Sequence, residues 1–180
     1  DAFGEALALK PSYEWAWTGQ GNSLLSLDRV DAAIEAQRQA VNLRPGMPEA
    51  HTNLATALYT SGDLDGAIVE YGKAIELKPD LAAAHCNLGA VLADTGDADG
   101  AIHELKQALR LRPAFAEAQF LLGSLHLKEG RFDEALLCLR QAHALLANRP
   151  ELSLEVARSI ETAERKAALD PRGAFLLTNL

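Results

Sequence analysis

Two consecutive segments of the chain carry nearly the same sequence. Residues 51–79 read HTNLATALYTSGDLDGAIVEYGKAIELKP, and residues 85–113 read HCNLGAVLADTGDADGAIHELKQALRLRP. The aligned residues lie 34 positions apart, among them His51 and His85, Asn53 and Asn87, Gly62 and Gly96, and Pro79 and Pro113. A fixed period of this size indicates a helical repeat, because one such unit cannot bury its own apolar face and has to stack on its neighbours.

The small and apolar residues of these segments recur at fixed positions. Each unit is counted from three residues before its histidine and closes on a proline. In one repeat these residues are Leu54, Ala55, Leu58, Ala67, Tyr71, Ala74 and Pro79, and in the next they are Leu88, Gly89, Leu92, Ala101, Leu105, Ala108 and Pro113. This spacing resembles the tetratricopeptide repeat, although the fourth position, usually aromatic in that family, is histidine here. The resemblance implies an all-α fold, a right-handed α-solenoid (superhelix) of tandem helix-turn-helix repeats.

The small residues explain how two helices of such a unit can pair. Gly or Ala stands at the eighth and twentieth positions, as Gly89 and Ala101 do in the third repeat. Two antiparallel helices approach closely only where a side chain is missing, so these positions let the paired backbones pack. A bulky residue there is expected to force the helices apart.

The period extends over most of the chain. Pro11 lies 34 residues before Pro45, so residues 1–13 are predicted to hold the second helix of a truncated repeat. Complete repeats are then predicted at 14–47, 48–81, 82–115 and 116–149. The first of them has Gln37 where a large apolar residue is expected, and Asp28 where the others place a turn glycine. Its inter-helix turn is therefore expected to differ from the other turns.

The periodic array is predicted to end near residue 149. The frame requires a closing proline at Ala147, but the proline comes later, at Pro150. Residues 150–170 predict an amphipathic capping helix with one apolar face and one face for water. That apolar face consists of Leu152, Val156, Ile160, Ala163 and Ala167. Residues 171–180 are predicted to be a flexible tail.

Composition and charge limit the class of partner. The 180 residues carry a formal charge of -8, two cysteines and no long apolar run. Nucleic-acid binders need clustered Lys and Arg, so the acidic balance argues against nucleic acid, and no membrane insertion is expected. Cys86 and Cys138 lie on different helices, which disfavours a disulfide and weakly favours a reducing, cytoplasmic location.

The resemblance also suggests where a ligand would bind. In the tetratricopeptide family the first helices line a concave groove, and residues three and four apart share a helix face. Carried onto this chain, the groove is expected to be small and polar in its first half and apolar toward the end. The candidate peptide-binding residues are Asn22, Glu49, Thr52, Asn53, Thr56, Tyr59, Cys86, Asn87, Phe120 and Ser124.

Two asparagines occupy the same position one repeat apart. An amide offers both donors and an acceptor, so a row of amides can hold the backbone of an extended peptide. The segments around Asn53 and Asn87 resemble the asparagine ladder of the superhelical repeat domain of O-linked N-acetylglucosamine transferases, without any catalytic domain. The ladder is incomplete, because Gly19 and Leu121 occupy this position in the outer repeats. The alternative is that both amides bond only neighbouring helices or water.

Other kinds of site are disfavoured. The fifth positions are Thr18, Thr52, Cys86 and Phe120, so the clamp by which some family members hold chaperone carboxylates is absent. His51 and His85 lie a full repeat apart, too far for one metal ion, and are interpreted as packing residues. Cys86 has no positioned base, and no catalytic motif or phosphate-binding loop is present. We expect no enzyme activity, no cofactor and no metal.

We therefore predict that the protein is a non-catalytic scaffold that binds a peptide or helix of a partner protein in its groove. One alternative is a substrate-recruitment or regulatory segment of a larger enzyme, such as a glycosyltransferase or a kinase. A weaker alternative is end-to-end self-association through the apolar face of residues 3–9. The sequence does not identify the partner.

Overall fold

The structure is a computed structural model that describes Phe3, Leu9 and residues 13–169. The predicted second helix of a truncated repeat at 1–13 and the predicted tail at 171–180 lie almost wholly outside these described residues. The described part contains nine α-helices and no strand, so the prediction of an all-α repeat array is confirmed.

The helices begin at a constant spacing. The first helices of successive pairs are α2 (Glu14–Ser26), α4 (Pro48–Ser61), α6 (Ala82–Thr95), α8 (Ala116–Lys128) and α10 (Pro150–Leu169). The second helices are α3 (Val30–Leu43), α5 (Leu64–Leu77), α7 (Ala98–Leu111) and α9 (Phe132–Leu145). Each first helix starts 34 residues after the previous one, and so does each second helix.

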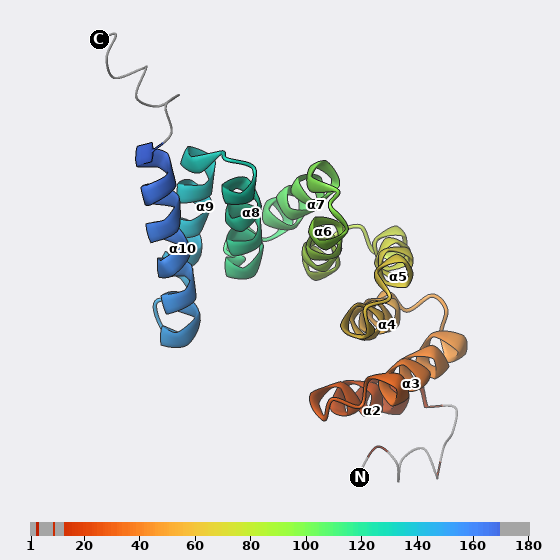
Figure 1. Cartoon of the computed structure of the whole chain (residues 1–180). Helices are drawn as coiled ribbons and strands as arrows, with labels where there is room; N and C mark the ends of the chain where they lie inside the picture. Colours follow the sequence, from red (N-terminus) through yellow and green to blue (C-terminus); the bar gives the residue numbers. More distant parts are fainter. Residues whose placement is uncertain (1–2, 4–8, 10–12, 170–180) are drawn as a thin grey trace. The chain divides into compact units, whose positions relative to one another are not determined.

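The helices form two compact units. Unit 1 ends at Asp97 and contains α2 to α6, and unit 2 begins at Ala98 and contains α7 to α10. In unit 1 each helix packs on the next, and the first helices α2, α4 and α6 also touch in sequence. In unit 2, α8, α9 and α10 lie side by side, and α7 packs on α8 (Figure 1).

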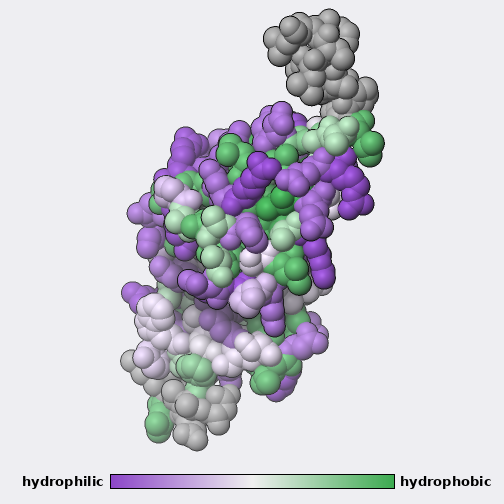
Figure 2. Space-filling model, turned by 90° about the vertical axis from the view of Figure 1, so that its left-hand side faces the viewer, coloured by the Kyte–Doolittle hydropathy of each residue, from purple (hydrophilic) through white to green (hydrophobic). Residues whose placement is uncertain are grey.

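One face of the molecule is mostly polar. Charged and polar residues predominate on the face in Figure 2, and hydrophobic residues form small separate patches there. No helix of the described part combines the length with the apolar composition that crossing a lipid bilayer requires.

A residue in the left-handed conformation ends the first helix of four pairs. Gly62, Gly96 and Gly130 have φ angles of 87°, 88° and 73°. Asp28 has φ 57° and is the one described residue other than glycine with a positive φ. Its turn was expected to differ, but it adopts the same backbone region as the others, because Asp tolerates this conformation better than most residues with a Cβ.

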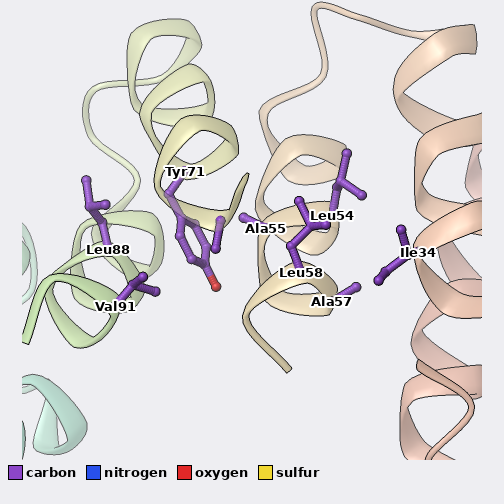
Figure 3. Packing of buried hydrophobic residues seen from close by; sticks show 9 residues of the cluster. Ile34, Leu54, Ala55, Ala57, Leu58, Tyr71, Leu88 and Val91 are labelled. Carbon is purple, nitrogen blue, oxygen red and sulfur yellow. The ribbon is translucent and has the colours of Figure 1, made fainter. Parts of the chain in front are cut away.

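The core of unit 1 is built around α4. Leu54, Leu58 and Ala57 point from α4 toward Ile34 of α3, and Ala55 points toward the ring of Tyr71 on α5 (Figure 3). Tyr71 is almost fully enclosed. The absence of a large side chain at Ala55 is what makes room for this ring, as the small-residue pattern predicted.

Glycines at the same position receive the large residue of the second helix in other pairs. A Cβ added at Gly123 would lie 2.8 Å from Leu139 Cγ, and one added at Gly21 would overlap the side-chain amide of Gln37. Both approaches are closer than van der Waals contact, so Gly123 and Gly21 are needed for close helix pairing.

The core of unit 2 joins α9 to α10. Leu139 and Ala142 pack with Val156 and Ala163, and Ile160 lies against the same cluster. Two expectations for α10 need correction. Leu152 is exposed and does not belong to the packed face. Pro150 is also no displaced closing proline, because it is the first residue of α10, as Pro48 is the first residue of α4. A proline is favoured there, since its missing N–H would have no helical partner. The period therefore continues unshifted, and its eighth position is the small Ala157.

Candidate functional site

The predicted groove residues of unit 1 lie on α2, α4 and α6. Glu49 and Asn22 are exposed, and Thr52, Asn53, Thr56, Tyr59 and Asn87 are half-buried. The exception is Cys86, whose side chain is 0% exposed. A thiol without accessible surface cannot contact a ligand, so we remove Cys86 from the candidate surface. The remaining residues of this unit are called the α4/α6 face below: Asn22, Glu49, Thr52, Asn53, Thr56, Tyr59 and Asn87.

The threonines of this face bond to their own helix. The hydroxyl of Thr52 donates to the carbonyl of Pro48 at 2.9 Å, and that of Thr56 donates to the carbonyl of Thr52 at 2.9 Å. Because Thr56 has no second hydrogen, the hydroxyl of Tyr71 donates to Thr56 Oγ1, at 2.9 Å. The proton of each hydroxyl is therefore already used inside the fold.

Gln37 orients the exposed amide of Asn22. Gln37 Nε2 donates to the carbonyl of Thr18 at 3.3 Å and to Asn22 Oδ1 at 2.9 Å. The backbone carbonyl can only accept, which identifies the nitrogen of Gln37 and, in turn, the oxygen of Asn22. The Asn22 amide nitrogen is thereby presented to solvent. Gln37 stands where the repeat pattern expects a large apolar residue, and in the fold its buried amide forms these two hydrogen bonds.

Tyr59 connects α4 to α6. Its hydroxyl donates to Asp94 Oδ2 at 2.5 Å. This hydrogen bond, followed by burial and the negative charge of Asp94, raises the pKa of Tyr59 from 10.0 to about 12. The phenol therefore stays neutral at physiological pH and ties the two first helices together.

The amides of Asn53 and Asn87 differ from these neighbours. Within the described residues, neither side chain makes a hydrogen bond. Glu49, by contrast, is paired, because its Oε1 lies 3.8 Å from Lys78 Nζ, and both of these side chains are roughly half exposed. Asn53 and Asn87 therefore keep both amide donors and the acceptor available, on two first helices that touch each other.

The predicted groove residues of unit 2 have a more apolar setting. Phe120 lines a pocket of about 620 Å³, and Ser124 is half-buried one helical turn further along α8. Phe115 lines the same pocket, and the guanidinium of Arg112 stands 3.3 Å from the centre of its ring. The wall is formed mainly by Leu145, Leu146, Leu152 and Val156, with Glu117, Arg149 and Glu155 among the polar residues.

The two histidines of the repeated segment are buried. His51 Nδ1 lies 2.6 Å from Glu70 Oε2, and His51 Nε2 donates to the carbonyl of Pro45 at 2.8 Å. His85 Nε2 donates to the carbonyl of Pro79 at 3.0 Å. Each imidazole therefore links its own helix, α4 or α6, by a hydrogen bond to the proline of the preceding turn. Among the described residues no three potential metal ligands gather at one place.

Glu70 is the acidic partner in this arrangement. Burial opposes its ionisation, but hydrogen bonds from Lys73 at 2.8 Å and from His51 prevail and lower the pKa of the carboxyl. Cys86 and Cys138 are buried and form no disulfide, and burial raises the pKa of the Cys138 thiol, which favours its protonated form.

Four polar pairs that join different helices of the repeats were not predicted from the sequence. Asn22 with Gln37 and Thr56 with Tyr71 are each separated by 15 residues. His51 with Glu70 is separated by 19 residues, and Tyr59 with Asp94 by 35. Polar residues recurring at these separations are a signal in the sequence, but only the packing of the helices shows that they meet.

Comparisons with known proteins agree with the helical period. A family model described as a tetratricopeptide repeat matches residues 1–48 and 86–150, and a second, described as a TPR repeat, matches residues 56–96. No curated protein matches this chain.

Solved structures with the same fold are numerous. The thermophilic TPR protein TTC0263 of Thermus thermophilus is 27% identical over 88% of this chain and 87% of its own, with a TM-score of 0.78. MamA is 24% identical over 83% of this chain and 88% of its own, with a TM-score of 0.72. YrrB, described as a TPR protein with an unusual peptide-binding site, is 20% identical over 100% of this chain and 99% of its own, with a TM-score of 0.68.

Because the tetratricopeptide model covers well over half of the chain, and the helices recur at its period of 34 residues, the chain belongs to the tetratricopeptide repeat family.

Proposed function

We propose that this protein is a non-catalytic scaffold whose α4/α6 face binds an extended peptide segment of a partner protein. Membership of the tetratricopeptide repeat family supports a protein-interaction scaffold as the general function. The peptide-binding site named for YrrB supports peptide as the ligand class.

The observation that carries the proposal is the free amide pair. Asn53 and Asn87 occupy the same repeat position on α4 and α6, two helices that touch. The polar groups around them are engaged within the fold, through the Thr52 and Thr56 hydroxyls and the Tyr59 bond to Asp94. A peptide main chain offers one donor and one acceptor per residue, which is what two free amides can satisfy.

Charge favours a neutral or basic segment. Glu49 and Asp94 both lie on the exposed part of α4 and α6, and the whole chain has a formal charge of -8. An acidic peptide would be repelled during its approach, whereas a basic one would be attracted.

We further place the protein in a reducing compartment such as the cytoplasm. Cys86 and Cys138 form no disulfide. Disulfides persist mainly in oxidising environments, so two cysteines kept as thiols are better suited to a reducing one.

A displayed library of random peptides tests the proposed function. Peptides selected on the wild-type protein are expected to bind the double variant Asn53→Ala/Asn87→Ala at least about tenfold more weakly, since two hydrogen-bonding side chains are lost. The melting temperature should hardly change, because neither amide bonds to a described residue.

The matched control is Gln39→Ala/Asn42→Ala, which removes two exposed amides from α3. This control is expected to keep the selected peptides. Equal binding by the wild type and the Asn53/Asn87 variant would refute the proposed site. A loss of fold in that variant would show that the amides are structural.

A further inference from the structure

An apolar pocket opens on unit 2 at the start of α10, next to α8. It is the pocket of about 620 Å³ described above, and its volume is within the range of ordinary ligand pockets. We call it the Leu152 pocket. Its apolar walls come from the turn before α8, from α8 itself, from the end of α9 and from α10, and they include Phe115, Phe120, Leu145, Leu146, Leu152 and Val156.

Leu152 is a large residue at a position where the repeat has a small one. In the four earlier first helices the third residue of the repeat is a buried alanine, at Ala16, Ala50, Ala84 and Ala118. Leu152 is instead 45% exposed, and Leu145 of the same lining is 44% exposed. Exposed apolar residues that gather around one hollow are typical of a surface that another segment covers.

The charged residues of the lining determine the kind of segment. They are two cations and two anions, so their charges cancel: Arg112, Arg149, Glu117 and Glu155. The guanidinium of Arg112 already stands 3.3 Å from the centre of the Phe115 ring. A charged occupant would be attracted by one pair and repelled by the other, and it would lose its hydration against the apolar walls. The pocket therefore suits an apolar segment without charge.

The chain contains such a segment shortly after α10. Residues 173–177 read GAFLL, with three consecutive large apolar residues, Phe175, Leu176 and Leu177, and no charged side chain. The sequence predicts a flexible tail there, because the helical period does not continue. Three large apolar side chains are nevertheless stabilised when they leave water, so a nearby apolar pocket is a favourable place for them.

The length of chain between this segment and α10 matches the distance to the pocket. Leu169 ends α10 and follows Leu152 by 17 residues and Val156 by 13, about 25 Å and 20 Å along a helix. Phe175 and Leu177 follow Leu169 by six and eight residues, about 20 Å and 26 Å of extended chain. A segment that turns back along α10 therefore brings Phe175 level with Val156 and Leu177 level with Leu152.

We infer that residues 173–177 of the same molecule occupy the Leu152 pocket, where Phe175 and Leu177 pack against Phe120 and Leu152. The segment closes the apolar part of the predicted groove. A partner that is to contact Phe120 has to displace it first, so the contact is autoinhibitory for this part of the surface. The pocket lies in unit 2 and the α4/α6 face lies in unit 1, so this inference does not rest on the proposed function.

A nitroxide on the introduced cysteine of Thr178→Cys tests the contact in the whole protein. Cys86 and Cys138 are buried, so the reagent attaches to the new thiol. The amide signals of Phe120 and Leu152 are expected to broaden strongly in the ¹⁵N spectrum, although Leu152 is about 25 Å from the end of α10. A tail outside the pocket would broaden mainly the signals nearest Leu169, and that pattern would overturn the inference.

A mixed sample distinguishes the molecule's own segment from that of a second copy. Spin-labelled protein without ¹⁵N is mixed with ¹⁵N protein that carries no nitroxide. The amides of Phe120 and Leu152 are expected to stay sharp in this mixture. Broadening of these signals in the mixture would assign the pocket to the segment of a second copy, and the inference would be wrong.

Three variants of the spin-labelled protein locate the contact. Phe175→Ser/Leu176→Ser/Leu177→Ser and Leu152→Glu should each remove the broadening. Leu154→Glu is the matched control, since Leu154 is 55% exposed on the same helix but does not line the pocket, and it should keep the broadening. Broadening that survives in the triple variant, or that is lost in folded Leu154→Glu, would contradict the inference. The triple variant decides if Leu152→Glu does not fold, because its changes lie outside the described helices.

Discussion

Units 1 and 2 are built on one helical frame but fill its equivalent positions with different chemistry. In unit 1 the large residue of the second helix is polar, with Gln37 bonded to Asn22 and Tyr71 bonded to Thr56. In the last pair of unit 2, the same position is Leu139, enclosed in an apolar cluster. The small residue opposite is present in both units. The small residues therefore determine how closely two helices approach, whereas the residue that fills the space can be polar or apolar.

The largest expected effect comes from removing that space. Gly123→Leu should destabilise the protein by about 1–3 kcal/mol or more, because its Cβ alone would lie 2.8 Å from Leu139 Cγ and 3.2 Å from the carbonyl oxygen of Ala135. Chemical denaturation would measure the change. Gly72→Ala is the matched control, since a Cβ there meets nothing within 4 Å, and it should stabilise α5 slightly. An unchanged midpoint in Gly123→Leu would show that helix spacing does not depend on the small residue.

The second prediction concerns the pair that His51 and Glu70 form in unit 1. Glu70→Gln should cost about 1–3 kcal/mol at neutral pH, because His51 and Lys73 lose a charged acceptor. The pKa of Glu70 is lowered in the fold, so its contribution is present above the ordinary value of 4.5 and is lost as the pH falls through the folded value.

Denaturation midpoints measured from pH 7 down to pH 3 would check this sign. The wild type should lose more stability than Glu70→Gln over that range. Cys138→Ser, at the equivalent position of unit 2, should show no such difference in pH dependence. Parallel curves for the wild type and Glu70→Gln would contradict the assignment.

The third prediction sharpens the comparison of the turns. Asp28→Gly should stabilise the protein by about 0.5–1 kcal/mol. The change relieves the strain of a left-handed residue that carries a Cβ, and the greater loss of backbone entropy by glycine on folding offsets part of this gain. Gly62→Ala should act in the opposite direction, because its φ of 87° is unfavourable for alanine. Thermal unfolding of both variants gives the answer, and a destabilised Asp28→Gly would imply that the carboxylate contributes more than its backbone strain costs.

The smallest effect on stability is expected at Tyr59. Its pKa of about 12 predicts a late phase in an ultraviolet absorbance titration of the tyrosines, and Tyr59→Phe should remove the contribution of this residue. Because the folded pKa lies above the ordinary value of 10.0, the bond to Asp94 contributes stability below that value and loses it as the pH rises through about 12. If every tyrosine of the wild type titrates at the ordinary value, the bond is absent in solution.

Much of the fold could be predicted because the repeat places particular residue types at fixed positions. Small residues such as Ala55 and Gly123 indicate where two helices pack closely, and turn residues such as Gly62 indicate a positive φ. Pro150 was misinterpreted because a proline can close one repeat or open the next helix, and only the start of α10 distinguishes these cases.

The candidate site could be predicted less well. Cys86 shares a repeat position with Thr52, but burial depends on the surroundings of a side chain and not on its position in a helix. The bonds of Gln37 and Tyr71 join residues on different helices, so they follow from packing that no single segment specifies. The availability of Asn53 and Asn87 is a property of the same kind.

The threonines of α4 have one more consequence. Thr52, Thr56 and Thr60 each donate to the carbonyl four residues earlier, but the oxygen of Thr56 also accepts from Tyr71, so Thr52 and Thr60 are the hydroxyl acceptors left for a ligand. These two threonines are eight residues, or about 12 Å, apart along α4, close to the length of four residues of an extended strand at about 13 Å. A strand displaced along α4 by four residues would meet the same kind of acceptor again, so the hydroxyls fix its alignment poorly. Discrimination between one alignment and the next then falls to the amides, which occur once on each helix.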